Sequence, residues 1–447
     1  MRKFRNGVLA VTLVLGLLLA ACVAPGAPAA QTGASAGGGA AASAGKEVKI
    51  RWWHIWPADT SPEGANWQKL ADAYMKDHPN VKIEITIIPN DPYKDKLATN
   101  MQAGDPPDLF QTWGGGVLWQ YADAGLVQDL TDALKGSDWG DSFLPAPMAV
   151  YQHNGKTFGV PWRFGMVGIW YNKALFEKAG IKETPKTWPD LLAAVKKLKD
   201  AGITPIAVGE KDKWPGHFWW SYLAVRNAGQ AGFAKAQERT GAFSDAPFIT
   251  AGEQLKQLLD LDPFQKGHLE QTYGDEQVVM AKEEAAMELM GQWAFGANKN
   301  VAEKNLDNYV AHTGWFPFPS VEGGAGKPND AFGGGDGFAI GKNAPPETID
   351  FVKFLTNKEN QTNMAAEGLA VLPVVKGAES AVKEPVMQVV LKHFGEAEYL
   401  QLYLDQFLPP AVGLAVNDNV QELFAGTKTP EQVADAIEEV AKTEMSK

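Results

Sequence analysis

The stretch from Gly159 to Gly209 decides the fold: GVPWRFGMVGIWYNKALFEKAGIKETPKTWPDLLAAVKKLKDAGITPIAVG. Its apolar run, Met166 to Tyr171, predicts a buried strand. The helix that follows is expected to end at Gly180, because glycine readily adopts the left-handed conformation after a helix. Thr187 is expected to cap a second helix before the chain returns to a strand. This order indicates an α/β protein in which residues 159–163 are the first crossing between two lobes.

Strands and helices also alternate on the N-terminal side of this stretch. Residues 48–52 and 81–87 have the patterns of strands, and helical patterns follow both of them. Such alternation favours a mostly parallel sheet with covered faces. A chain of 447 residues is too long for one ordinary core. We expect lobe 1 to comprise residues 47–160 with 310–345, and lobe 2 to comprise residues 161–309 with 346–447.

The N-terminus has the pattern of an export signal. Arg2, Lys3 and Arg5 precede an apolar run that ends in Leu-Ala-Ala-Cys at Cys22, which resembles a bacterial lipobox. We therefore expect residues 1–21 to be a signal peptide and Cys22 to be lipidated. Residues 22–46 are rich in Ala, Gly, Ser and Pro and are expected to form a flexible tether. The predicted location is extracytoplasmic, at the cell surface or in the periplasm, with a lipid anchor in the cell membrane.

Charge and cysteine usage exclude several classes of protein. Loss of the three N-terminal cations from 41 basic residues leaves 38 against 53 acidic residues, a formal charge of −15. Such a chain is not expected to bind nucleic acid. A single cysteine excludes an intrachain disulfide, and the 7 histidines show no metal-ligand spacing. We expect no metal and no cofactor.

Tryptophan is the anomalous residue of this composition, with 15 in the chain. A core needs few tryptophans, and each carries an N–H group that requires a partner. Some lie at helical, turn or strand-core positions and are expected to serve packing: Trp67, Trp119, Trp139, Trp170 and Trp188. Others are expected where strands end, at the edge of an α/β sheet where ligands bind.

Three motifs carry a family resemblance. Gly104-Asp105-Pro106-Pro107-Asp108, the crossing with Tyr171-Asn172-Lys173, and Gly291-Gln292-Trp293-Ala294 with a downstream Pro-Phe-Pro occur in this order. In this the chain resembles the bacterial extracellular solute-binding proteins of sugar ABC importers, the maltose-type family 1, from Val48 onward. The resemblance implies a type II periplasmic-binding-protein fold, whose two hinged α/β lobes close over a sugar. It also implies ABC permease subunits as partners, a monomer and no catalysis.

The predicted ligand contacts combine aromatic rings with polar groups. Flat rings bury the C–H faces of a pyranose, and polar side chains pair with its hydroxyls. Asp336 follows three glycines that would let a ligand approach the backbone, although the glycines would also suit a turn. Arg163 would pair either with a sugar hydroxyl or with an acidic residue at the hinge. The complete set of predicted ligand-binding residues is Trp53, His54, Glu63, Trp113, Arg163, Trp214, His217, Trp219, Trp293, Asp336, Glu367 and Asp405.

The sequence leaves open alternatives for the identity of the ligand and for the function. Trp113 and the glycines after it lack the acidic and basic residues that some relatives carry there, which favours a monosaccharide or short-oligosaccharide ligand. A polyamine or quaternary amine would also suit a box of acids and aromatic rings. A glycoside hydrolase would need paired acids, for which Asp105 with Asp108 and Glu283 with Glu284 are candidates. A purely structural lipoprotein would leave the tryptophans unexplained.

Overall fold

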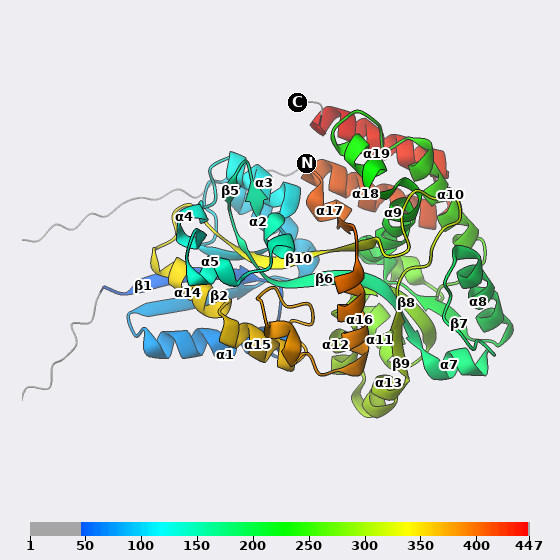
Figure 1. Cartoon of the computed structure of the whole chain (residues 1–447), viewed down its shortest axis with the longest axis horizontal. Coiled ribbons are helices and arrows are strands. Elements are labelled where there is room, and N and C mark those ends of the chain that lie inside the picture. Colours follow the sequence, from blue (N-terminus) through cyan, green and yellow to red (C-terminus); the bar gives the residue numbers. More distant parts are fainter. Residues whose placement is uncertain (1–45, 446–447) are drawn as a thin grey trace, which may run out of the picture. The chain divides into compact units, whose positions relative to one another are not determined.

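The computed structural model describes residues 46–445, which fall within one compact unit. A sheet with the strand order β2-β1-β3-β10-β6-β8-β7 runs through this unit (Figure 1). The strands are β1 (Val48–His54), β2 (Val81–Ile87), β3 (Leu109–Thr112), β6 (Val160–Asn172), β7 (Thr204–Ala207), β8 (Ala285–Gly291) and β10 (Ala331–Ile340). Two short strands extend it, β9 (Thr313–Phe316) on β6 and β11 (Leu400–Leu402) on β10.

Two long antiparallel strands, β6 and β10, connect the two halves of the sheet. The first part of β6 pairs with β10, with Arg163 opposite Asp336, and its second part pairs with β8, beginning at Val167. The predicted crossing at residues 159–163 is therefore mostly strand, and the strand continues into the second lobe. The predicted run of glycines ahead of a strand is likewise inside β10, whose pairing with β6 shifts register between Asp336 and Gly337. Figure 1 shows both strands crossing the middle of the molecule.

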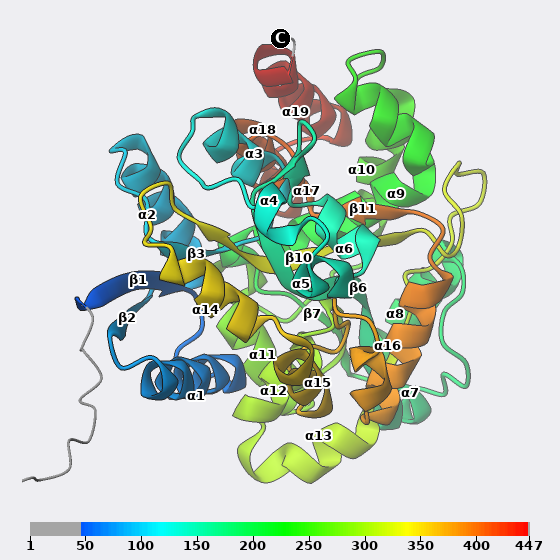
Figure 2. The ribbon, with the colours of Figure 1, turned by 60° about the vertical axis from the view of Figure 1, so that its left-hand side comes forward.

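Helices cover the sheet on both sides of these strands (Figures 1 and 2). Those before β6 are α1 (Pro62–Asp77), α2 (Asn90–Gln102), α3 (Gly115–Asp123), α4 (Thr131–Leu134), α5 (Asp138–Ser142) and α6 (Pro145–Ala149). Those between β6 and β10 are α7 (Lys173–Lys178), α8 (Trp188–Asp200), α9 (Trp214–Gln237), α10 (Ala246–Leu259), α11 (Tyr273–Ala281), α12 (Ala294–Val301) and α13 (Leu306–His312). Those after β10 are α14 (Glu347–Leu355), α15 (Lys358–Ala366), α16 (Pro385–Glu396), α17 (Leu404–Phe407), α18 (Pro410–Phe424) and α19 (Pro430–Met445).

Shorter elements complete the chain. A hairpin ahead of β6 is formed by β4 (Gln152–His153) and β5 (Lys156–Thr157), with Gly155 in its turn at a positive φ of 74°. Single-turn 3-10 helices lie at Glu210–Asp212, His268–Glu270, Glu303–Asn305 and Ala378–Ala381.

Local sequence signals account for the predicted unit that follows the crossing. The Thr187 side chain accepts a hydrogen bond from the backbone N–H of Asp190, and the Asp190 carboxylate accepts from the backbone N–H of Thr187. This reciprocal cap satisfies N–H groups that the first turn of α8 leaves free. Gly180 has a φ of 69° just after α7. Both features match the sequence predictions.

The aromatic core of the first lobe explains its tryptophans. Trp67 on α1 lies 5.9 Å from Trp52 and 4.8 Å from Trp162 between ring centroids, both edge to face. Trp67, Trp139, Trp170 and Trp188 are buried, as expected for packing residues. Trp119 is only half-buried and stacks on His153.

Two segments lie in a different lobe from the one expected. Strand β9 pairs with the part of β6 from Ile169 to Asn172, on the side of β8, although residues 310–345 were assigned to lobe 1. Helix α14 packs its Phe351 ring against Trp52 and Tyr74 of the first lobe, although residues 346–447 were assigned to lobe 2. Local sequence patterns do not show which sheet or helix these elements meet.

The predicted signal peptide at residues 1–21, the lipidation site Cys22 and all but the last residue of the predicted tether at 22–46 lie outside the described residues.

Within residues 46–445, no helix combines the length and the apolar character that crossing a bilayer requires.

Candidate functional site

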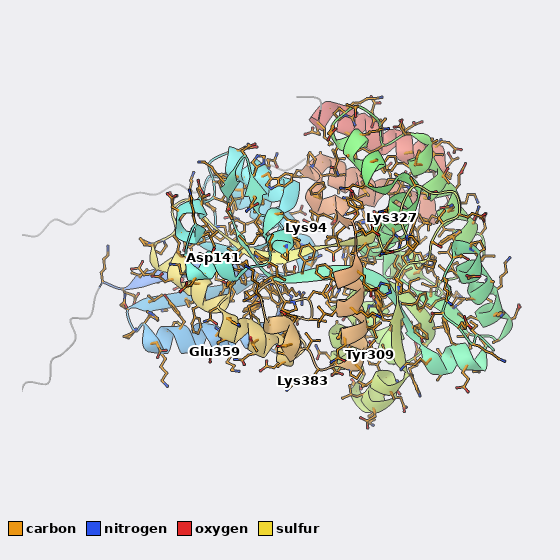
Figure 3. The ribbon with its side chains drawn as sticks, in the orientation of Figure 1. Lys94, Asp141, Tyr309, Lys327, Glu359 and Lys383 are labelled. Atoms are coloured by element: carbon orange, nitrogen blue, oxygen red, sulfur yellow. The ribbon has the colours of Figure 1, made fainter. Side chains whose placement is uncertain are left out.

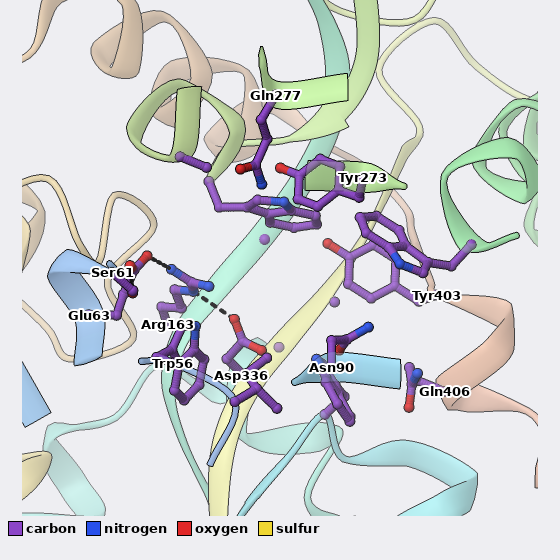
Figure 4. Close-up of a pocket in the computed structure, with 18 of the residues that line it drawn as sticks. Trp56, Ser61, Glu63, Asn90, Arg163, Tyr273, Gln277, Asp336, Tyr403 and Gln406 are labelled. Carbon is purple, nitrogen blue, oxygen red and sulfur yellow. Dashed lines mark hydrogen bonds and ion pairs between the residues drawn. The ribbon is translucent and has the colours of Figure 1, made fainter. Parts of the chain in front are cut away.

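A cavity of about 360 Å³ lies where the two lobes and the long strands meet. Seven of the predicted residues line it: Glu63, Trp113, Arg163, Trp214, Trp293, Asp336 and Asp405. They come from α1, β6, β10, the start of α9, α17 and the ends of β3 and β8, so the fold gathers side chains that are far apart in the sequence. In Figure 4 the labelled side chains converge on this cavity from all sides.

Arg163 is the centre of the polar wall of this cavity. Its Nε donates to Asp336 Oδ2 at 2.6 Å, and its Nη1 donates to Glu63 Oε1 at 2.9 Å (Figure 4). The guanidinium also lies over the ring of Trp162, with 4.5 Å to the centroid. Burial opposes the charge of Arg163, but the two carboxylates outweigh burial and raise its pKa. The group is therefore a fixed cation whose charge is met within the protein.

Asp405 forms the second ion pair of the cavity. Its Oδ2 accepts from Lys94 Nζ at 3.0 Å and from Gln406 Nε2 at 2.9 Å. Burial would raise the pKa of Asp405, but Lys94 and then His217 bring it below the usual value. Lys94 on α2 is half-buried and lines the cavity, whereas Lys327 and Glu359, labelled with it in Figure 3, are exposed. Among the described residues, every charged side chain that lines this cavity thus has a partner of opposite charge.

Aromatic rings form the opposite wall. The Trp293 ring lies 6.5 Å from that of Trp214 and 6.2 Å from that of Tyr403, edge to face with the tyrosine. A Cβ added to Gly291 would come within 2.0 Å of the Trp293 ring, so the indole rests directly on the backbone at the end of β8. Phe218 stacks on Tyr403 at 5.4 Å between centroids. These contacts hold the rings in place before any ligand binds.

Glycines of the two long strands leave the space that one of these rings, Tyr403, occupies. A Cβ on Gly334 would lie 2.3 Å from the Tyr403 ring, and one on Gly165 would lie 2.7 Å from the Tyr403 hydroxyl. The sequence analysis expected the glycines before Asp336 to admit a ligand to the backbone; at Gly334 they admit a tyrosine instead. The Tyr403 hydroxyl is buried and has no hydrogen-bond partner within residues 46–445. A buried donor of this kind favours a ligand oxygen or a water molecule beside it.

Trp53 and His54 do not line the cavity, which corrects their predicted position. Strand β1 continues to His54, where it still pairs with Ile87, so the loop begins at Ile55. His54 is buried, accepts a hydrogen bond from the backbone N–H of Trp56, and burial lowers its pKa to about 4. Trp56 takes the place in the cavity wall that Trp53 was expected to occupy.

His217 and Trp219 are also placed away from the cavity surface. Helix α9 begins at Trp214, and residues four apart lie on one face of a helix. Trp214 and Phe218 therefore share the cavity face, whereas His217 and Trp219 turn into the core and are buried. Burial lowers the pKa of His217 to about 4, so it is neutral at pH 7 although its Nε2 lies 3.6 Å from Asp405.

Glu367 borders a neighbouring space. It is exposed at the end of α15 and lines a second, smaller cavity that also touches Glu63, Arg163 and Trp293.

Several cavity residues had no distinctive sequence signal. Tyr273 and Gln277 lie one turn apart on α11, and Asn90 stands at the start of α2. Further lining residues outside the predicted set include Trp56, Lys94, Phe218, Asn300, Tyr403 and Gln406. Three of them lie beside predicted contacts: Trp56 just after His54, Phe218 between His217 and Trp219, and Gln406 after Asp405.

The acids considered for hydrolysis form other contacts. Asp108 Oδ2 accepts from the backbone N–H of Arg51 at 2.7 Å, and Asp105 accepts from the guanidinium of the same arginine. Glu283 accepts from Asn172 at 2.6 Å and lies 2.6 Å from the His312 ring. Neither pair lines the cavity. Within the described part of the chain, no group of three or more His, Cys, Asp or Glu side chains is arranged to hold a metal ion.

Behind the aromatic wall lie two buried glutamates, Glu276 on α11 and Glu288 on β8. Glu288 Oε1 accepts from Asn298 Nδ2 at 2.7 Å, and Glu276 Oε2 accepts from the backbone N–H of Gly209 at 2.8 Å. Burial raises the pKa of Glu288 to about 7, and burial together with the charge of Glu288 also raises the pKa of Glu276. These carboxyl groups are therefore protonated well above the pH at which glutamate ordinarily ionises.

Glu288→Gln is expected to flatten the pH dependence of stability between pH 4.5 and 7. Over this range the folded chain keeps a proton on Glu288 that the unfolded chain has lost, so stability falls as pH rises, by at most about 1.4 kcal/mol per pH unit. Glutamine has no proton to lose and preserves the oxygen that Asn298 contacts. Urea unfolding at pH 5, 6 and 7 measures the difference between the two proteins.

The difference in pH dependence between wild type and Glu288→Gln separates the effect of Glu288 on stability from that of the buried histidines. His54 and His217, with lowered pKa values, make stability rise with pH from about 4 to 6.5, in the wild type and the variant alike. Parallel pH curves for the two proteins would contradict a protonated Glu288 in the fold.

Comparison with known proteins gives consistent matches. The family described as "Bacterial extracellular solute-binding protein" matches residues 58–362. An uncharacterized ABC transporter extracellular-binding protein of Pyrococcus horikoshii is 29% identical over 285 residues, which are 62% of this chain and 61% of that protein, less than two thirds of its length. A multiple sugar-binding protein of Streptococcus mutans is 25% identical over 354 residues, 76% of this chain and 79% of that protein. Among solved structures, a chitin oligosaccharide binding protein superimposes with a TM-score of 0.82 at 27% identity, over 90% of this chain and 100% of that one.

Proposed function

Because the chain belongs to the family of bacterial extracellular solute-binding proteins, we propose that it is the sugar-binding subunit of an ABC importer. It captures an uncharged mono- or short oligosaccharide in the cavity between its lobes and delivers it to the permease. Two of the similar proteins are named for sugars, one for multiple sugars and one for chitin oligosaccharides. The family and these names support a carbohydrate ligand, and the cavity supplies the physical reasons.

The observation that carries this proposal is that the cavity has aromatic rings on one side and charged groups already neutralised by ion pairs on the other. Trp214, Trp293 and Tyr403 present flat apolar surfaces for the C–H faces of a sugar ring. Opposite them, the charges of Arg163 and Lys94 are already met by carboxylates, so a charged ligand would gain little. Hydroxyl groups can still bond to these ions, because each carboxylate oxygen accepts more than one hydrogen bond. Such a cavity favours a neutral polyol over a polyamine.

Closure of the lobes would follow from binding to both of them. A ligand shifts a conformational equilibrium only by its differential affinity for the two states. A sugar held between Trp293 of one lobe and Glu63 of the other makes its full set of contacts only when the lobes are together. A micromolar ligand has about 8 kcal/mol of binding free energy, enough to shift a hinge equilibrium of a few kcal/mol. The closed protein then docks on the permease subunits.

The proposal extends to the anchor and the assembly. Lipidation at Cys22 would hold a monomer at the outer face of the membrane, with residues 22–46 as the tether. It would perform no catalysis itself, because the candidate acid pairs Asp105–Asp108 and Glu283–Glu284 lie away from the cavity. Release of reducing ends from an oligosaccharide incubated with the protein would contradict this and favour a hydrolase.

A thermal-shift screen against mono- and disaccharides tests the proposal. A ligand at 100 times its dissociation constant stabilises the folded state by about 2.7 kcal/mol, which raises the melting temperature by several degrees. The best sugar should bind equally well at 50 and 500 mM NaCl, since screening leaves a neutral ligand unaffected. No shift with any sugar, together with a salt-sensitive shift with putrescine or choline, would replace the sugar by an amine.

A further inference from the structure

A second cavity of about 150 Å³ adjoins the first. The two share part of their lining, namely Glu63, Arg163, Trp293 and Asn300. The ring of Trp293 and the Arg163–Glu63 ion pair therefore border both spaces. On its far side the second cavity is lined by the end of α15 and by α16, where Glu367 is exposed. The second cavity thus lies between the main cavity and the surface.

The lining of the second cavity resembles that of the first in chemistry. Lys299 Nζ and Glu384 Oε1 pair at 3.2 Å, so these opposite charges meet within the protein. Gln292 and Asn300 offer amide groups, while Phe295 and Met387 offer apolar surface. Lys299 also lies over the Phe295 ring, 5.3 Å from its centroid. A space with paired charges, amides and apolar patches suits another neutral polyol unit and would hold water in its absence.

The two volumes indicate the length of the ligand. A cavity of about 150 Å³ is large enough to bind a six-membered ring such as benzene, so the second cavity has the size for a single sugar ring. By the same measure the first cavity has room for about two units. A monosaccharide would leave most of the combined space to water and forgo the contacts with α12 and α16.

We propose that the second cavity binds a further sugar unit, so that the ligand is an oligosaccharide of about three units passing between Trp293 and the Arg163–Glu63 pair. This inference rests on the proposed function and adds the length of the ligand to it. The outer unit contacts Lys299, Gln292 and Asn300, and its free end faces Glu367 and the solvent. Longer chains then extend past Glu367 without further contacts.

Gly296 offers a way to block the second cavity alone. It lies on α12, lines the second cavity and not the first, and a Cβ built on it meets no heavy atom within 4 Å. Gly296→Phe therefore has room to extend its ring into the second cavity without a backbone clash. Gly296→Ala is the matched control, since a methyl group leaves most of the space open and alanine is favoured in a helix.

The experiment measures affinity against chain length by isothermal titration calorimetry. The probes are chito-, xylo- and malto-oligosaccharides of one to five units, added to wild type, Gly296→Ala and Gly296→Phe. In the series that binds, wild-type affinity should rise at least tenfold from two units to three and then level off. Gly296→Phe should lose at least tenfold for three units and less than threefold for two. Gly296→Ala should behave like the wild type.

The outcomes separate this inference from the proposed function. Wild-type affinity that is already maximal at one or two units overturns the inference and leaves sugar binding intact. The same holds if Gly296→Phe, with wild-type circular dichroism, binds three units as well as Gly296→Ala does. Binding of no sugar of any length rejects the proposed function and the inference with it. Because the length series needs no substitution, it decides the question even if Gly296→Phe does not fold.

Discussion

Arg163→Met is expected to lower the free energy of unfolding by about 3–5 kcal/mol, because removing one member of a buried ion pair leaves its partners charged and unpaired. Only 7% of the Arg163 side chain is exposed, and it holds Asp336 and Glu63, which are 12% and 18% exposed. Methionine fills most of the space that the arginine occupies beside Trp162 and Trp56. The loss of unfolding free energy therefore comes mainly from the unpaired charges and less from lost packing. Urea unfolding with linear extrapolation measures it.

A double substitution separates the ion pair from other effects. Asp336→Asn in the Arg163→Met background should recover part of the loss, because the uncompensated carboxylate is removed. The control is Lys49→Met, which breaks an exposed pair with Glu84 and should leave stability unchanged within error. If Arg163→Met were as mild as Lys49→Met, the cluster around Arg163 would not be the rigid polar wall described above.

Trp293→Ala is expected to lower sugar affinity on the order of 30- to 1,000-fold, or about 2–4 kcal/mol, the range of a central aromatic contact. Its ring rests on Gly291 and borders both cavities, so its loss removes a surface that no neighbouring ring can replace. Calorimetric titration with the sugar that gives the largest thermal shift measures the change. The melting temperature of the unliganded protein should change far less than the ligand-induced shift.

Trp119→Ala is the matched control for this substitution. Trp119 is a half-buried tryptophan that stacks on His153 and lies outside both cavities. It should bind the sugar with unchanged affinity. Equal affinity of Trp293→Ala and Trp119→Ala would remove Trp293 from the binding surface and with it the proposed position of the ligand.

The parts of the fold that were predicted correctly are those that short-range chemistry determines. The cap at Thr187 and the stop at Gly180 each depend on residues within a few positions of one another. The family match and the α/β fold with two lobes confirm the resemblance that the motifs suggested. In contrast, the end of β1 depends on Ile87, its partner on another strand, and no local signal placed it at His54.

The candidate site shows the same division. Trp113 and Trp293 follow strands, and both line the cavity, because sheet ends meet at one edge. Trp214, His217 and Trp219 at the start of α9 were all predicted to contact the ligand, but only Trp214 lines the cavity, since which side of a helix is buried depends on its packing. Tyr403 could not be identified from the sequence at all. Its role depends on a slot left by Gly165 and Gly334, two glycines on different strands.

The shift of register between Asp336 and Gly337 has a mechanical consequence. The paired parts of β6 and β10, Val160–Met166 with Gly333–Phe338, form a ribbon that β6 alone continues toward β8 and β9, and an irregular pair is where such a ribbon bends. Asp336, which holds Arg163, sits at that point. Bending of the ribbon there would turn the carboxylate and tilt the two halves of the sheet in a single movement. Such a bend would need no relay between the cavity and the outer surface, because Asp336 lies both at the irregular pair and in the cavity wall.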